Sequence, residues 1–117
     1  MTDIRPRLFT ADEVRALYVA DCRRHYSEPL SFDGGVSSLD VLGRIGCLDA
    51  CDARTDDEEA ELQLLYMVFY HGRLASRHWY DGTAVFAGVL PDDEDPAYYA
   101  KFEVNGRVFY AEKDDDD

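Results

Sequence analysis

The chain has 117 residues, a net charge of −13 and a hydrophobic fraction of 46%, with eight tyrosines, six phenylalanines and one tryptophan. This composition excludes a disordered acidic chain, which would be poor in aromatic residues, and no apolar run is long enough to cross a bilayer. We expect a single α+β domain over residues 1–113, followed by a disordered acidic tail over residues 114–117.

Two helices are predicted in the first half of the chain. Thr10 and Glu13 have the spacing of a capping box, and apolar residues follow at helical spacing up to about residue 25. Ser37 or Ser38 can cap a second helix, which continues to about Cys51. The sequence therefore predicts two helices before residue 55.

The segment that follows carries conflicting signals. Thr55 and Glu58 form another capping-box pattern, which favours a helix through Tyr70. However, residues 62–70 include many strand-forming types, and His71-Gly72 has the composition of a tight turn. Our interpretation is a short helical turn that leads into a strand over about residues 62–70.

The remaining sequence predicts β-structure. Asp81-Gly82 and Asn105-Gly106 favour type I′ turns, in which both central residues adopt positive φ. We therefore expect hairpins that join residues 74–80 to 83–89 and residues 98–104 to 107–111. Between the hairpins, residues 91–96 form an exposed acidic loop. The predicted fold is α+β, with two N-terminal helices packed on a C-terminal antiparallel β-meander of four to five strands.

The negative charge is concentrated in two parts of the chain. Residues 31–70 carry nine acidic residues against two arginines, and residues 91–117 carry ten against three basic residues. Residues 71–90 between them are nearly neutral. Such a field repels nucleic acid and anionic membranes and attracts basic protein surfaces. The charge pattern predicts a basic protein partner and no direct contact with nucleic acid or membrane.

The predicted partner-binding residues are acidic side chains in the two charged segments. Carboxylates spaced along a surface imitate phosphates and pair with arginine and lysine, while neighbouring aromatic residues supply apolar anchors. In the first segment these residues are Asp49, Asp52, Asp56, Asp57, Glu58, Glu59 and Glu61. In the second they are Asp92, Asp93, Glu94 and Asp95. A solvated acidic surface that serves only solubility is the alternative interpretation.

The cysteines carry a weak metal-site signal. Cys22 and His25 share one predicted helical face, and Cys47 and Cys51 share another. Neither pair has the Cys-x2-Cys spacing that is typical of structural zinc sites. We therefore expect buried thiols, with no bound metal and no cofactor.

The histidines carry no clear catalytic signal. His71 and His78 lie near Asp81 in the sequence, but their order matches no catalytic triad, and a general base needs a partner within hydrogen-bond reach. We therefore assign no catalytic residue and expect that the protein is not an enzyme.

The resulting prediction is a small cytoplasmic inhibitor or antidote that occupies the basic, nucleic-acid-binding surface of a partner protein. DNA-mimicking anti-defence proteins and immunity proteins act in this way. The first residues lack the apolar core of a signal peptide, and three cysteines suit a reducing compartment. The alternatives are a stand-alone acidic domain of a halophilic or high-GC organism, and a small enzyme that uses His71 or His78. Acidic residues clustered on one surface would favour docking onto a partner, whereas dispersed acidic residues would favour the halophilic or high-GC interpretation. A pocket with convergent polar groups would favour the enzyme interpretation.

Overall fold

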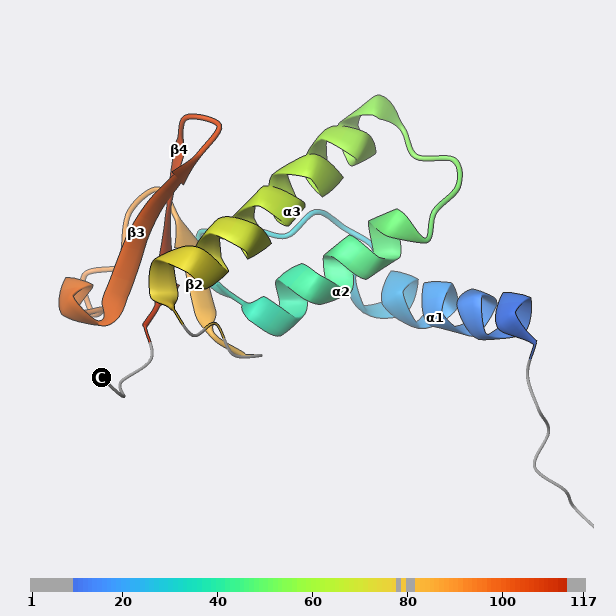
Figure 1. Ribbon diagram of the computed structural model, residues 1–117, viewed down its shortest axis with the longest axis horizontal. Coiled ribbons are helices and arrows are strands. Elements are labelled where there is room, and N and C mark those ends of the chain that lie inside the picture. Colours follow the sequence, from blue (N-terminus) through green and yellow to red (C-terminus); the bar gives the residue numbers. More distant parts are fainter. Residues whose placement is uncertain (1–9, 78, 80–81, 114–117) are drawn as a thin grey trace, which may run out of the picture.

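The computed structural model describes residues 10–77, 79 and 82–113, which form an α+β arrangement of three α-helices and one four-stranded antiparallel sheet (Figure 1). In chain order the elements are α1 (Ala11–His25), β1 (Val36–Ser37), α2 (Ser38–Asp49), α3 (Asp56–Ser76), β2 (Ala84–Ala87), the 3-10 helix η1 (Pro96–Tyr98), β3 (Tyr99–Val104) and β4 (Arg107–Glu112). The α+β class and the antiparallel sheet are confirmed, although three helices replace the two that were expected.

Each of the three helices begins with a capping box. The side chain of the first residue of the box accepts the amide of the fourth, and the fourth side chain accepts the amide of the first, which satisfies two otherwise unpaired donors. The pairs are Thr10 with Glu13, Ser37 with Asp40 and Thr55 with Glu58, with N···O distances between 2.9 and 3.1 Å. The predicted helix starts at Thr10 and Ser37 are confirmed.

The strand predicted over residues 62–70 is wrong, because these residues belong to the long helix α3. Leu62, Leu65 and Val68 are buried at helical spacing, so packing on one face of the helix outweighs the β propensity of the aromatic residues. The turn predicted at His71-Gly72 is also wrong, since both residues lie inside α3.

The sheet has the strand order β1-β2-β4-β3, and every neighbouring pair is antiparallel. Strands β3 and β4 form the predicted hairpin, in which Phe102 pairs with Phe109. Asn105 and Gly106 connect them with φ values of 50° and 79°, the combination that a type I′ turn requires. This hairpin is confirmed in position and in turn type.

The hairpin predicted at Asp81-Gly82 is wrong. Residues 74–76 are the last turn of α3 rather than a strand, and β2 pairs with β1 and β4 instead. Consequently the sheet is not a simple meander, because its edge strand β1 comes from the segment before α2. Residues 78, 80 and 81 and the tail over residues 114–117 lie outside the described part of the chain.

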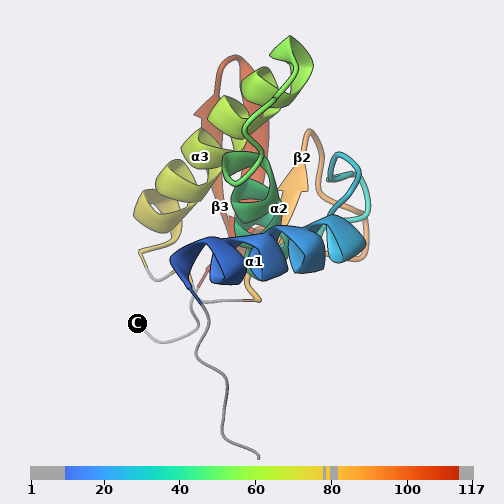
Figure 2. The same cartoon turned by 90° about the vertical axis from the view of Figure 1, so that its right-hand side faces the viewer.

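The helices stack in layers on one face of the sheet. Helix α3 packs on β3 and β4, α2 packs beside α3, and α1 packs on α2 away from the sheet (Figures 1 and 2). The core lies between α2, α3 and the sheet, and fully buried side chains at its centre include Val41, Leu48, Leu65 and Phe109.

None of the helices in the described part of the chain combines the length and apolar character needed to span a bilayer.

Candidate functional site

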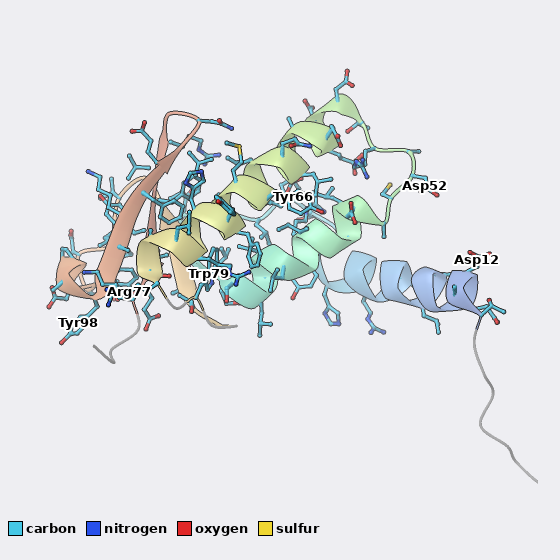
Figure 3. All side chains as sticks on the ribbon, in the orientation of Figure 1. Asp12, Asp52, Tyr66, Arg77, Trp79 and Tyr98 are labelled. Carbon is cyan, nitrogen blue, oxygen red and sulfur yellow. The ribbon has the colours of Figure 1, made fainter. Side chains whose placement is uncertain are left out.

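The seven acidic residues predicted in the first segment lie at one corner of the molecule, where α2 ends and α3 begins (Figure 1). Four aspartates at this corner have exposed side chains, and Asp52 lies at the outer side of the α2–α3 connection (Figure 3). We call these four residues the acidic corner: Asp49, Asp52, Asp56 and Asp57. The three glutamates at this corner are only partly exposed, and each accepts a hydrogen bond from another part of the chain.

Glu61 is bound by a buried arginine rather than presented to solvent. Arg44 donates from Nε and Nη2 to the two carboxylate oxygens of Glu61 at 2.8 and 2.7 Å, and from Nη1 to the carbonyl of Tyr26 at 2.6 Å. The side chains of Arg44 and Glu61 are 5% and 17% exposed. The hydrogen bond to Glu61 raises the pKa of the Arg44 guanidinium, against the opposing effect of burial. Glu61 therefore joins α3 to α2 and to the end of α1.

The other two glutamates also have partners inside the molecule. Glu58 completes the capping box of α3, and Glu59 accepts from Nε of Arg54 at 2.6 Å. Arg54 also donates to the carbonyls of Leu48 and Cys51 at 3.1 Å, so it satisfies acceptors at the C-terminal end of α2. Its pKa is raised, mainly by the hydrogen bond to Glu59. Of the seven acidic residues predicted here, the four of the acidic corner have exposed side chains.

The second acidic segment forms a loop between β2 and η1 at the other end of the long axis of the molecule (Figure 1). Asp92, Asp93 and Asp95 are exposed. Asp95 also caps η1 by accepting the amide of Ala97 at 3.0 Å. The acidic corner and the acidic loop are well separated, so a compact surface on a partner contacts only one of them at a time.

Glu94 accepts the hydroxyl of Tyr99 at 2.8 Å. Burial, followed by this hydrogen bond and the charge of Glu94, raises the pKa of Tyr99 well above its ordinary value of about 10. The folded state therefore holds the phenol proton more tightly than the unfolded state. The stability that results is fully present below the unfolded pKa and is lost as the pH rises above it.

We expect Tyr99→Phe to destabilise the protein by about 1 kcal/mol at neutral pH, because the hydrogen bond to Glu94 is lost. Above about pH 10 the difference from the wild type should shrink, since only the wild type then loses the contribution of the Tyr99 proton. Urea unfolding at both pH values measures this, with the exposed Tyr66→Phe as the control. A difference that stays constant with pH would contradict the assignment.

The cysteines and histidines that the structure describes lie at separate places in the fold. Cys47 is buried and Cys51 is half-buried, and the side chain of Cys22 is outside the description. His25 is exposed at the end of α1, and His71 stacks edge-on against Tyr70. His78 lies outside the described residues. Within the described residues, no three His, Cys, Asp or Glu side chains are placed to hold a metal ion.

A groove of about 420 Å³ runs between the segment 29–33, α3 and the start of β4. Leu30, Phe32, Leu64 and Leu65 contribute to its walls, and Glu61 in it is already bound by Arg44. Convergent polar groups are the feature that distinguishes an active-site pocket. Besides Glu61, the exposed side chains of Asp33 and Arg107 line this groove.

An exposed face of α3 was not predicted from the sequence. Tyr66, Tyr70 and Leu74 are 43%, 61% and 64% exposed, and Arg73 and Arg77 extend this face to the end of the helix. Their spacing of three to four residues is helical, but it was obscured when this segment was interpreted as a strand.

The fold and its surface define an acidic α+β protein with two separated anionic groups and an aromatic–arginine face on one helix. Comparisons with protein-family models, with curated proteins and with solved structures found no match.

Proposed function

We propose that the protein acts by binding the basic surface of another protein through its acidic corner. The favoured partner is a nucleic-acid-binding protein, because such proteins carry dense arginine and lysine surfaces that normally contact phosphates. An acidic protein that covers this surface excludes the nucleic acid and acts as an inhibitor or antidote. No catalytic role is assigned to the protein.

The position of Asp49 is the observation that carries this proposal. Asp49 is the last residue of α2, where the helix dipole disfavours a carboxylate by about 0.3–1 kcal/mol. Asp56 and Asp57, by contrast, lie in the first turn of α3, where acidic residues stabilise the helix. The charge of Asp49 contributes to the raised pKa of Arg54, so Asp49 has a cationic neighbour within the molecule. Its carboxylate is nevertheless exposed at an unfavourable helix position, and recruitment of a basic partner gives it a further role.

The grouping of the acids supports docking over a habitat effect. Asp49, Asp52, Asp56 and Asp57 surround one connection, and the acidic loop over residues 92–95 is at the opposite end (Figure 1). Exposed acids that served only general solubility would not need this arrangement. The acidic corner is the favoured docking site, since it gathers four exposed aspartates, whereas Glu94 of the loop is only partly exposed and binds Tyr99.

The test replaces exposed acids without disturbing the fold. We expect D49N/D52N/D57N to slow association with a partner captured on the full chain by roughly tenfold at low salt, because steering charges act mainly on the association rate. Added salt should slow the wild type much more than this variant, since the Debye length falls to about 8 Å at physiological ionic strength. Stopped-flow or surface plasmon resonance measures both rates.

The matched control removes the same amount of charge elsewhere. Glu28, Asp33 and Glu103 are exposed and lie outside both acidic groups. E28Q/D33N/E103Q should therefore leave most of the association rate in place. Equal effects of the two triple variants would mean that net charge, and not the acidic corner, controls binding, and would refute the proposal.

A further inference from the structure

The exposed face of α3 changes character along the helix. Beginning at the N-terminal end, Asp56, Ala60, Gln63, Tyr66 and Tyr70 are exposed at intervals of three or four residues. Arg73 continues this face in the last turn, and Arg77, the C-cap residue with a φ of 66°, lines the same groove as Arg73. One continuous surface is thus acidic at its start, aromatic in the middle and basic at its end. We call these seven residues the α3 stripe.

The α3 stripe lies opposite the buried face of the helix. Leu62, Leu65 and Val68 point into the core, and the sheet and α2 cover that side. In Figure 2, α3 lies at the edge of the molecule, with α2 on its other side. The label of Tyr66 in Figure 3 marks the middle of the stripe.

The basic half of the stripe is hollowed. A groove of about 380 Å³ is lined by Phe69, Tyr70, Arg73, Leu74 and Arg77. Tyr70, Arg73 and Leu74 follow the helical spacing i, i+3 and i+4, which places them on one side of α3, and Arg77 closes the groove just beyond the last turn. Arginine and tyrosine are also the residue types that contribute most to binding at protein interfaces. This surface is suited to another helix with an acidic end.

We propose that the occupant is a second copy of this chain, which pairs α3 with α3 in antiparallel orientation about a twofold axis. With the twofold axis between positions 66 and 67, Arg77 of one copy lies opposite Asp56 of the other. In the same register Arg73 lies opposite Ala60, and Tyr70 lies opposite Gln63. The basic groove of each helix thereby receives the acidic half of the other, and the contact is self-complementary, as a twofold interface requires.

Charge complementarity favours this occupant over an unrelated helix. Two copies, each with a net charge of −13, repel one another at long range, so association needs a local arrangement that offsets the repulsion. The antiparallel pairing provides it, because Arg77 of each copy meets Asp56 of the other, and Arg73 lies on the side of the acidic first turn of the other α3. A parallel pairing would place like charges together at both ends. The α3 helix of 21 residues is about 30 Å long, which gives room for the whole pattern.

A charge-exchange experiment on the full chain tests the pairing and its register. R73E/R77E places a carboxylate opposite Asp56, and D56K/A60K places lysines opposite Arg73 and Arg77, so each variant alone should be monomeric. When the two variants are mixed, the two introduced carboxylates of the first would face the two introduced lysines of the second, so the mixture should dimerise. Sedimentation velocity distinguishes the 13.3 kDa monomer from a dimer.

Wild-type protein is expected to be dimeric in a concentration series at physiological ionic strength, and circular dichroism checks that each variant is folded. A wild type that is monomeric throughout, an R73E/R77E variant that stays dimeric, or a mixture that stays monomeric would each overturn the proposal. R73E/R77E keeps all four residues of the acidic corner, so partner binding measured with this variant distinguishes failure of the dimer from failure of the docking function.

A matched pair of leucine variants keeps the proposal testable if a charge variant fails to fold. Leu74 borders the groove on α3 and is 64% exposed, and Leu39 is 49% exposed on α2. We expect L74A to raise the dimer dissociation constant by about tenfold or more, and L39A to leave it unchanged. Equal constants for the two folded variants would contradict the assignment of this face.

Discussion

Replacing Arg44 with alanine is expected to lower the free energy of unfolding by about 3 kcal/mol, the lower end of the range for breaking a buried ion pair. The lower end applies because the Glu61 side chain keeps 17% exposure and can recover some contact with water. The substitution also leaves the carbonyl of Tyr26 without its charged donor, which loosens the contact between the end of α1 and α2. Urea unfolding gives the change, provided that the m value stays constant.

Glu61→Gln and Glu59→Gln form the matched comparison for this pair. Both remove one carboxylate from the same helix, but Glu61 faces the buried Arg44, whereas Glu59 faces the more exposed Arg54. Glu61→Gln should therefore destabilise clearly, and Glu59→Gln should have a much smaller effect. Equal losses would show that burial of Arg44 does not set the strength of its interaction with Glu61.

Replacing Gly72 with leucine should lower the free energy of unfolding by about 2–4 kcal/mol. Loss of a packed aromatic side chain costs about 3–5 kcal/mol, and the higher helix propensity of leucine offsets about 1 kcal/mol of this loss. Gly72 is buried in α3, and a side chain at this position would run into the indole ring of Trp79. That ring also packs against Phe69, with 5.4 Å between the ring centroids. The indole must move out of its site before any larger residue fits.

Gly34→Ala provides the reference for this second prediction. Gly34 is exposed, and a Cβ there would have no neighbour within 4 Å. Its substitution should change stability by less than about 0.5 kcal/mol, as is usual for the surface. Thermal unfolding and the fluorescence of Trp79, the only tryptophan, report both variants. An unchanged emission spectrum in Gly72→Leu would mean that the indole has not been displaced.

The parts of the fold that depend on neighbouring residues could be predicted from the sequence. The capping boxes at Thr10 and Thr55 and the turn at Asn105-Gly106 each depend on residues at most three apart, so short-range patterns contain the necessary information. The α+β class follows from the order of helical and β patterns along the chain.

The parts that depend on distant contacts could not be predicted. His71-Gly72 has the composition of a turn, but Gly72 is small because Trp79 packs on it from beyond the end of α3. Similarly, Gly43 in α2 lies against the ring of Tyr26. Nothing within α3 alone indicates these contacts, and without them the aromatic residues of the segment favour a strand.

The candidate site was likewise predictable from the sequence only in part. The sequence identifies where acidic residues are concentrated, but Glu61 and its partner Arg44 are 17 residues apart. A count of charges treats Glu61 and Asp49 as equivalent, whereas one is buried against arginine and the other is exposed at a helix end. Choosing residues for a binding test therefore required the three-dimensional arrangement.

Competition with DNA tests most directly whether the acidic corner covers a nucleic-acid-binding surface. A partner captured at low salt on the full chain is purified, and fluorescence anisotropy follows its complex with a labelled DNA duplex as this protein is added. We expect the wild type to displace the DNA, and D49N/D52N/D57N to need a concentration at least about tenfold higher. A partner that holds this protein and the DNA at the same time, with unchanged affinity for each, would contradict the proposed function.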